Sequence, residues 1–354
     1  MNTSSNSPAS DSLKVAVFPG QGAQFVGMGK SLLNDFRIAR DTFEEASDAI
    51  SLNLKKLCLD GPESDLTLTE NTQPALLVTS VAAFRVAQAE LGFQAHAVAG
   101  HSLGEYSALV AAEALSLSQA TRWVRARGQA MQVAVPPGEG TMAAVLNLDE
   151  AGIRSLCAKA TLQAESQRTP QSPSTVACTV EPANFNAPGQ IVVAGSTDAV
   201  EVLISLVKSD PEFKGAKALP LKVSAPFHCS LMRPAREKMA EIFENTKPNE
   251  LPQQLRVPYF PNRTARLTHE AQVIFELFVE QIDHPVLWSQ TVTTAIQQHH
   301  ANEFIEFGPG KVLQGLIKRI APADSLRVLT GVSDTDSLRA FEILMRSSKG
   351  ESHL

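Results

Sequence analysis

The hydrophobic positions of this chain fall into short apolar runs, typical of buried strands, separated by longer stretches with helical spacing. Residues 13–24, LKVAVFPGQGAQ, predict a strand that feeds a tight glycine loop. Residues 71–91 predict a long apolar helix, and residues 95–115, AHAVAGHSLGEYSALVAAEAL, predict a strand, a sharp turn and a second helix. This alternation is typical of a parallel sheet with helices on both faces.

The middle of the chain follows a different order: strand, helix, strand, strand, helix, strand. This is the order of a ferredoxin-like unit. The expected strands lie at 141–148, 175–185, 190–196 and 216–223, and the expected helices at 149–163 and 197–208. After residue 223 the α/β rhythm resumes, and EFIEFGPG at 303–310 predicts another strand that ends in a glycine turn.

The sequence therefore predicts an α/β fold in which a core with a parallel sheet carries an inserted ferredoxin-like subdomain. We assign residues 13–137 and 223–345 to the discontinuous core and residues 138–222 to the insertion. The polar stretch 163–174, QAESQRTPQSPS, is expected to form a mobile loop. Residues 1–12 are expected to form a disordered tail, because they lack the basic and apolar regions of a signal peptide.

Composition narrows the class of protein. With 44% hydrophobic and 19% charged residues, the 354-residue chain is typical of a globular protein, and it contains no apolar run long enough to span a membrane. A net charge of −6 without a basic run argues against nucleic acid binding. The four cysteines show no C-x-x-C spacing, which argues against a zinc knuckle or a disulfide framework and favours the cytoplasm.

Residues 100–104, GHSLG, fit the G-x-S-x-G pattern, in which a serine occupies a strained turn between a strand and a helix. Flanking glycines let the backbone pass without a Cβ clash, and the N-terminus of the following helix favours developing negative charge. Because a strand is expected before this segment and a helix after it, Ser102 is the candidate nucleophile. A serine that caps the helix is the alternative, and one residue can do both.

A serine hydroxyl needs a base within hydrogen-bond reach, and His228 is the best candidate among the eight histidines. It follows the last strand of the insertion in VSAPFHCSLM, where Pro226 restrains the chain and apolar neighbours predict a half-buried pocket. A packed core histidine is the alternative. His101, adjacent to Ser102, is expected to orient the turn instead.

Arg127 lies in the middle of an apolar helical stripe. Residues 117–134 predict a helix, and at 100° per residue the stripe consists of Ala120, Trp123, Val124, Arg127, Met131 and Ala134. A guanidinium does not lose its proton, so its burial without a partner is very unfavourable. The partner is either a structural carboxylate or an anionic group of a substrate.

The glycine loop FPGQGAQ lacks the spacing of a phosphate-binding loop. A loop directly after the first strand can instead place a backbone N–H beside the serine turn. We therefore expect Gln21 and Leu103, the residue after the nucleophile, to donate main-chain hydrogen bonds to an oxyanion. No metal-ligand constellation and no cofactor motif is evident in the sequence, so no cofactor is expected.

Seven motifs occur in order across residues 15–320: FPGQGAQFVGMG, GHSLGEYSALVAAEALSL, RARGQAMQ, PANFNAPGQIVVAG, SAPFHCSLM, HPVLW and FGPGKVLQGLIKRI. Together they resemble the malonyl-CoA:acyl carrier protein transacylases. The resemblance implies an α/β-hydrolase-like core with a ferredoxin-like insertion, in agreement with the element order above. It also implies transfer of a malonyl group from malonyl-CoA to the phosphopantetheine thiol of acyl carrier protein, in fatty acid synthesis.

The resemblance implies a role for each candidate residue. Ser102 is acylated by the malonyl thioester, and His228 acts first as general base and then as general acid. Gln21 and Leu103 supply the oxyanion-hole N–H groups, and Arg127 binds the free malonyl carboxylate.

The same resemblance adds two positions. Gln281, in VEQIDHPVLW, matches the position whose backbone carbonyl orients the histidine, so no aspartate is required. Phe227, before the histidine, resembles that of malonyl-selective members and is expected to crowd a 2-methyl branch.

Three alternatives stay open from the sequence. A lipase or esterase uses the same serine turn, but it has no need of a buried cation at the acyl site. A discrete trans-acting acyltransferase of a polyketide synthase uses serine, histidine and arginine in the same way, so the sequence separates it poorly. A non-catalytic scaffold is disfavoured because Ser102, His228 and Arg127 are all present.

The expected partner is an acidic acyl carrier protein, which implies a local basic rim on this net-negative chain. Lys311, Lys318 and Arg319, in GKVLQGLIKRI, either form that rim or belong to a solvated helix face. We further expect a cytoplasmic monomer that binds neither nucleic acid nor membrane.

Overall fold

The computed structural model describes residues 13–169, 174–247 and 254–348. Within these residues the larger unit is built around a parallel sheet. In spatial order its strands are β7 (Tyr259–Phe260), β2 (Ala97–Gly100), β1 (Leu13–Phe18), β8 (Ala301–Phe307) and β9 (Val328–Val332). The predicted parallel sheet is therefore confirmed, with β1 at its centre.

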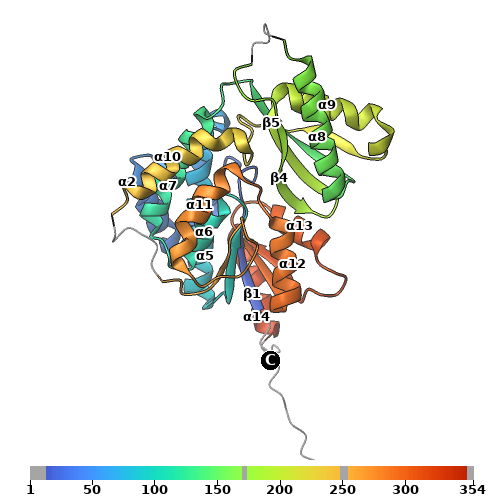
Figure 1. Ribbon diagram of the computed structural model, residues 1–354. Coiled ribbons are helices and arrows are strands. Elements are labelled where there is room, and N and C mark those ends of the chain that lie inside the picture. The colour runs from blue at the N-terminus through green and yellow to red at the C-terminus, as the bar shows by residue number, and fades with distance from the viewer. Residues whose placement is uncertain (1–12, 170–173, 248–253, 349–354) are drawn as a thin grey trace, which may run out of the picture.

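Helices cover both faces of this sheet (Figure 1). The helices of the larger unit are α1 (Lys30–Asp35), α2 (Arg37–Ile50), α3 (Leu54–Asp60), α4 (Glu63–Leu66), α5 (Thr69–Leu91), α6 (Gly104–Ala111), α7 (Leu117–Val133), α10 (Arg233–Glu244), α11 (Ile274–Asp283), α12 (Trp288–His299), α13 (Val312–Ile320) and α14 (Thr335–Ser348). Short 3-10 turns lie at Ser230–Met232 and Ala271–Val273.

The alternation of side chains along β1 divides the core between the two faces. Ala16 and Phe18 point into the main hydrophobic cluster, which α5 and α6 share. Val15 and Val17 point into a second cluster with α12 and α13. The strand is buried on both sides, which explains why its sequence is an apolar run without polar alternation.

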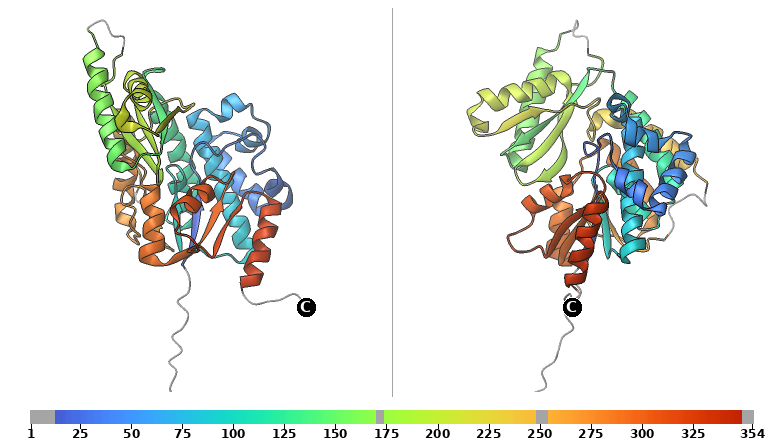
Figure 2. Two further views of the ribbon diagram at one scale, coloured as in Figure 1. Left: turned by 90° about the vertical axis from the view of Figure 1, so that its right-hand side faces the viewer. Right: turned by 180° about the vertical axis from the view of Figure 1, so that it is seen from behind.

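Residues 140–220 form the smaller unit, whose sheet is antiparallel with the strand order β4 (Val180–Ala187), β5 (Gln190–Ser196), β3 (Gly140–Leu146) and β6 (Lys217–Pro220). It carries α8 (Glu150–Gln167), α9 (Thr197–Ser209) and a 3-10 turn at Pro211–Phe213. This is the ferredoxin-like arrangement that the sequence predicts, and Figure 2 shows it beside one end of the core. We retain 138–222 as the proposed bounds of this subdomain.

Some expected boundaries are wrong. Helix α8 continues to Gln167, because QAESQ consists mostly of good helix formers, so the expected loop at 163–174 begins later. Strand β4 begins at Val180 and not at residue 175, because Thr175 donates its N–H to the Glu139 carboxylate instead of to a ladder. Strand β6 is only four residues long, shorter than the predicted 216–223. Residues 170–173 and the predicted tail 1–12 lie outside the described residues.

The register of the central sheet brings the glycine loop and the serine turn together. Phe18 pairs with Gly100, so β1 and β2 end level with each other. The glycine loop after β1 and the serine turn after β2 therefore leave the same edge of the sheet side by side, as ligand-binding loops of parallel sheets do. Within the described part of the chain, no helix combines the length and apolarity needed to cross a membrane.

Candidate active site

Ser102 occupies the sharp turn between β2 and α6, with a backbone φ of 51° in the left-handed region. The two flanking glycines are required by close packing. A Cβ on Gly100 would lie 1.9 Å from the carbonyl carbon of Gly104, and a Cβ on Gly104 would lie 2.0 Å from the carbonyl oxygen of Phe18. The G-x-S-x-G spacing therefore follows from the contact between the end of the strand and the start of the helix.

Asn262 bridges this turn from the loop that follows β7. Its Oδ1 accepts a hydrogen bond from the Ser102 N–H at 2.7 Å, and its Nδ2 donates to the Gly100 carbonyl oxygen at 2.6 Å. Asn262 is buried, so both bonds are shielded from water. The side chain holds the serine in a backbone conformation that otherwise costs of order 1–3 kcal/mol.

His228 connects the serine to the main chain of α11. Its Nε2 lies 2.7 Å from Ser102 Oγ, and its Nδ1 lies 2.8 Å from the Gln281 carbonyl oxygen. Because a carbonyl can only accept, Nδ1 carries the proton and Nε2 is free to accept the serine proton. Burial, together with the positive charge of Arg127, lowers the pKa of His228 to about 3. The ring is therefore neutral near pH 7, which is the form a base needs.

Arg127 is buried on α7 with its head group at the serine. Nη2 donates to Ser102 Oγ at 3.1 Å and to Gln281 Oε1 at 2.8 Å, and Nη1 donates to Gln73 Oε1 at 2.8 Å. All three partners are uncharged, and no ion pair to Arg127 is found among the described residues. The sequence left two partners open for Arg127, a structural carboxylate or an anionic substrate group. Within the described residues, no carboxylate forms an ion pair with it.

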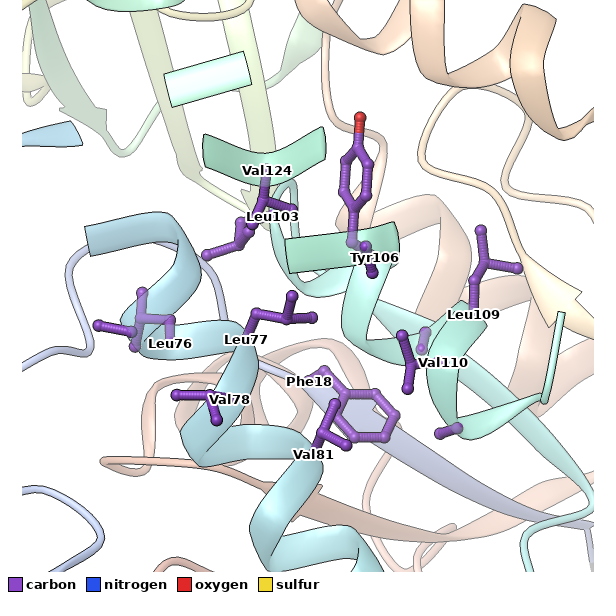
Figure 3. Close-up of a cluster of buried hydrophobic side chains, with 14 of the residues drawn as sticks. Phe18, Leu76, Leu77, Val78, Val81, Leu103, Tyr106, Leu109, Val110 and Val124 are labelled. Carbon is purple, nitrogen blue, oxygen red and sulfur yellow. The ribbon is translucent and has the colours of Figure 1, made fainter. Parts of the chain in front are cut away.

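Gln21 lies in the loop after β1 and Leu103 in the turn after β2, and these two segments leave the same edge of the sheet. A Cβ on Gly20 would lie 2.5 Å from the His101 carbonyl oxygen, which shows how closely the glycine loop approaches the turn. In the described segments, neither the Gln21 N–H nor the Leu103 N–H donates a hydrogen bond. The Leu103 side chain lies in the main core, close to Val124 (Figure 3).

The serine, the histidine, the arginine and the glycine loop line a cavity of about 420 Å³ between the core and the insertion. Ser102, His228, Arg127 and Gln21 are among its polar lining residues. The apolar wall consists of Met131, Met142, Val192, Leu221, Val223, Phe227, Val312, Leu313 and Leu316. A cavity of this size, with polar and apolar side chains in its lining, suits a small acyl group with a polar end.

A family model described as an acyl transferase domain matches residues 15–334. The chain belongs to the acyl transferase family. The resemblance found in the seven sequence motifs is thereby confirmed.

Relatives of this acyl transferase cover most of its length. The malonyl CoA-acyl carrier protein transacylase of Bacillus subtilis is 41% identical over 305 residues, which are 86% of this chain and 89% of the relative. The crystal structure of an acyl-carrier-protein S-malonyltransferase from Burkholderia pseudomallei is 40% identical, with a TM-score of 0.83 and coverage of 94% of this chain and 100% of the other. A malonyl-transacylase in complex with a type II polyketide synthase acyl-carrier protein is also 40% identical, with a TM-score of 0.82 and coverage of 93% and 98%.

The acyl transferase site contains three side chains that the sequence interpretation missed: Asn262, Gln73 and Glu105. Gln73 lies buried on the apolar helix α5, and Glu105 lies buried on the apolar helix α6. Because both helices are buried nearly all round, neither side chain stands out from an apolar stripe as Arg127 does on α7. Asn262 follows a two-residue strand without any periodic signal, so no pattern marks it.

His101 turns away from the serine, as expected from its position in the turn. Its Nε2 lies 2.8 Å from Asn186 Oδ1 on β4, so it joins the serine turn to the insertion. Burial lowers the pKa of His101, so it is a neutral contact between the two units.

Proposed function

We propose that this acyl transferase moves a malonyl group from malonyl-CoA to the phosphopantetheine thiol of acyl carrier protein in fatty acid synthesis, through an ester on Ser102. The observation that carries the choice of substrate is the position of Arg127. A buried cation with uncharged partners lies 3.1 Å from the serine oxygen, where the free carboxylate of a malonyl group would meet it.

In the first half-reaction, Ser102 Oγ attacks the thioester carbonyl carbon while His228 Nε2 takes the hydroxyl proton. The carbonyl oxygen becomes an oxyanion, which accepts hydrogen bonds from the Gln21 and Leu103 N–H groups. The bond from carbon to sulfur then breaks, and the CoA thiolate takes the proton from His228. The Gln281 carbonyl oxygen, 2.8 Å from Nδ1, orients the imidazole throughout.

The second half-reaction repeats these steps with another thiol. The phosphopantetheine thiol gives its proton to His228 and attacks the ester carbon, and the serine alkoxide recovers the proton as it leaves. One thioester replaces another, so the overall change in free energy is small. Arg127 keeps the malonyl group in the same position for both steps.

Arg127 also explains the selectivity for malonyl over acetyl groups. An acetyl group leaves the buried guanidinium without an anionic partner, a loss of several kcal/mol in transition-state binding. Phe227 lines the same cavity, and we expect it to disfavour a 2-methyl branch, although one methyl group is worth only about 1–3 kcal/mol. A simple esterase has no use for this cation.

The test is intact-protein mass spectrometry after mixing the enzyme with malonyl-CoA or acetyl-CoA, beside Ser102→Ala. We expect a malonyl adduct on the wild-type protein, little acetyl adduct, and neither on Ser102→Ala. Equal labelling by both thioesters would contradict the proposed role of Arg127, and no labelling would contradict the transfer itself.

The same chemistry serves a second kind of carrier. The similarity to a transacylase in complex with a polyketide synthase carrier protein favours a discrete acyltransferase of a polyketide pathway as the alternative. Offering both carriers to the malonyl-enzyme separates the two functions, because the true carrier accepts the malonyl group faster.

The carrier would meet α13 at the mouth of the cavity. Lys311 precedes this helix directly, and the next residue, Val312, lines the cavity. Lys318 and Arg319 are exposed at the far end of the helix, and Arg319 hydrogen-bonds Gln190 of the insertion. We place the enzyme in the cytoplasm, where its four free cysteines stay reduced. The monomeric state stays a prediction.

A further inference from the structure

Glu105 is a buried carboxyl group that the proposed mechanism does not use. It lies in the first turn of α6, three residues after the nucleophile, and is 1% exposed. Its Oε2 accepts a hydrogen bond of 2.5 Å from Gln281 Nε2, whereas its Oε1 has no hydrogen-bond partner among the described residues. A buried carboxyl so close to the reacting serine needs a reason.

The side-chain amide of Gln281 links this carboxyl to Arg127. A guanidinium only donates, so the amide oxygen must face Arg127, and the amide nitrogen must face the other way. There it donates to Glu105 and, at 3.0 Å, to the Ser102 carbonyl oxygen. Glu105 and the Ser102 carbonyl therefore both hold the Gln281 amide in the orientation that Arg127 requires, although Glu105 does not contact Arg127 itself.

The protonation state of Glu105 also affects how much of the Arg127 charge is available to a substrate. One arginine serves two acids, because the substrate brings its own carboxylate into the same buried site. If Glu105 ionises, the two carboxylates compete for one cation, and the low dielectric of the site makes that competition costly. If Glu105 is neutral, the whole charge of Arg127 is available to the substrate.

Among the described residues, the titratable groups around Glu105 are Arg127 from α7, Tyr259 from β7, Tyr106 beside it on α6, and His228 beyond Gln281. Burial raises the pKa of Glu105 to about 8, against the opposing effects of the Gln281 hydrogen bond, of the nearby Asn262 main-chain N–H and of the charge of Arg127. Burial also raises the pKa of both tyrosines, so they stay neutral where Glu105 titrates.

We propose that Glu105 is a positioning residue that aims Arg127 at the acyl site through the Gln281 amide, and that its neutral form is the one that admits a malonyl carboxylate. This inference rests on the proposed malonyl transfer. It makes Glu105, which touches no reacting atom, a determinant of specificity.

The decisive experiment measures the acylation half-reaction with malonyl-CoA from neutral to alkaline pH, as a maximal rate and a half-saturating concentration. In the wild-type enzyme the half-saturating concentration should rise above about pH 8, approaching about tenfold per pH unit, with a smaller change in maximal rate. Glu105→Gln keeps an acceptor for the Gln281 amide but cannot ionise, so the half-saturating concentration should stay flat.

Tyr259→Phe is the matched control. The Tyr259 hydroxyl makes no hydrogen bond in the described part of the chain, so its removal leaves the polar network intact while eliminating another titrating group. This variant should keep the alkaline rise of the wild type. A rise that persists in Glu105→Gln, or that disappears in Tyr259→Phe, overturns the proposal.

Glu105→Ala tests the positioning separately, because it removes the shorter of the two hydrogen bonds that hold the Gln281 amide nitrogen. The ratio of malonyl to acetyl acylation should fall by roughly tenfold or more, while Glu105→Gln keeps the ratio at neutral pH. If the wild type forms no malonyl adduct, the proposed function fails. If the wild type forms it and Glu105→Gln matches the wild type at every pH, only this inference fails.

Discussion

Arg127 Nη2 lies 3.1 Å from Ser102 Oγ, so the cation that would hold the far end of the substrate contacts the atom that would be acylated. Arg127 lies on α7 and Ser102 lies in the turn before α6, and these two helices pack against each other. Because both are held by buried partners, the distance between nucleophile and carboxylate site is fixed before the substrate arrives. This relationship ties substrate choice to catalysis.

Replacement of Arg127 by alanine should reverse the selectivity. The malonyl carboxylate would lose its partner in an apolar site, so kcat/KM for malonyl-CoA should fall roughly 100-fold or more, while acylation by acetyl-CoA should increase. Arg122→Ala removes a charge from the exposed face of the same helix and should change neither value. Steady-state rates with both thioesters check this, and an unchanged malonyl preference in Arg127→Ala would contradict it.

The kcat/KM for acylation should change little at moderately acidic pH. A histidine acts as a base only when it is unprotonated, and the pKa of His228 is lowered from 6.5 to about 3. The value of kcat/KM should therefore stay nearly constant from about pH 7.5 down to about pH 5. In Arg127→Ala the acidic fall in kcat/KM should occur at a higher pH, because the arginine charge is one cause of the lowered pKa of His228. A wild-type break near pH 6.5 would be inconsistent with this environment.

Asn262→Ala should release the serine turn. The variant loses two buried hydrogen bonds, so the maximal rate of acylation should fall about tenfold or more and stability should fall by about 2–3 kcal/mol. Asn262→Asp keeps an acceptor for the Ser102 N–H but loses the donor to the Gly100 carbonyl, and it should lie between alanine and wild type. Asn245→Ala, at an exposed asparagine, serves as control. Normal acylation by Asn262→Ala would show that the turn needs no such support.

Gly100→Ala should prevent correct folding, because its Cβ would overlap the backbone of Gly104 at 1.9 Å. Gly315→Ala gives the opposite result at another glycine. Nothing lies within 4 Å of a Cβ at Gly315, on helix α13, so alanine there should stabilise the protein by about 0.5–1 kcal/mol. Soluble yield and thermal denaturation of both variants check this pair.

Lys311→Glu should weaken the second half-reaction alone. If the acidic carrier approaches the cavity beside α13, the charge reversal should raise KM for the carrier several-fold at low salt, and less at high salt. The rate of acylation by malonyl-CoA should not change. Lys55→Glu makes the same change in charge on α3 and should behave as wild type. An equal effect of both variants would point to net charge instead of a docking contact.

The main site residues could be predicted from the sequence, because each is marked by the residues next to it in the chain. Ser102 is marked by its two flanking glycines, and Arg127 by its position on an apolar helical stripe. Both signals lie within a few neighbouring residues. His228 also follows from its surroundings, although its contact with Ser102 spans 126 residues. Its orientation by Gln281 came only from resemblance, because nothing in a helix sequence shows which carbonyl faces a distant ring.

The supporting contacts could not be predicted in the same way. Asn262 lies 160 residues from the serine whose backbone it holds, and it follows the shortest strand of the sheet. Gln73 and Glu105 were hidden for a different reason. Each lies on a helix buried all round, so the pattern shows no polar face on which a misplaced side chain would stand out.

The partner that orients His228 is a main-chain oxygen, and every amino acid provides one. No single codon change at position 281 can delete it while the helix end stays in place, whereas an aspartate in this role is lost by one substitution. A saturation mutagenesis screen at this position would therefore not report on the imidazole at all. It would report on the amide that stands between Arg127 and Glu105, and so on which acyl groups the enzyme accepts.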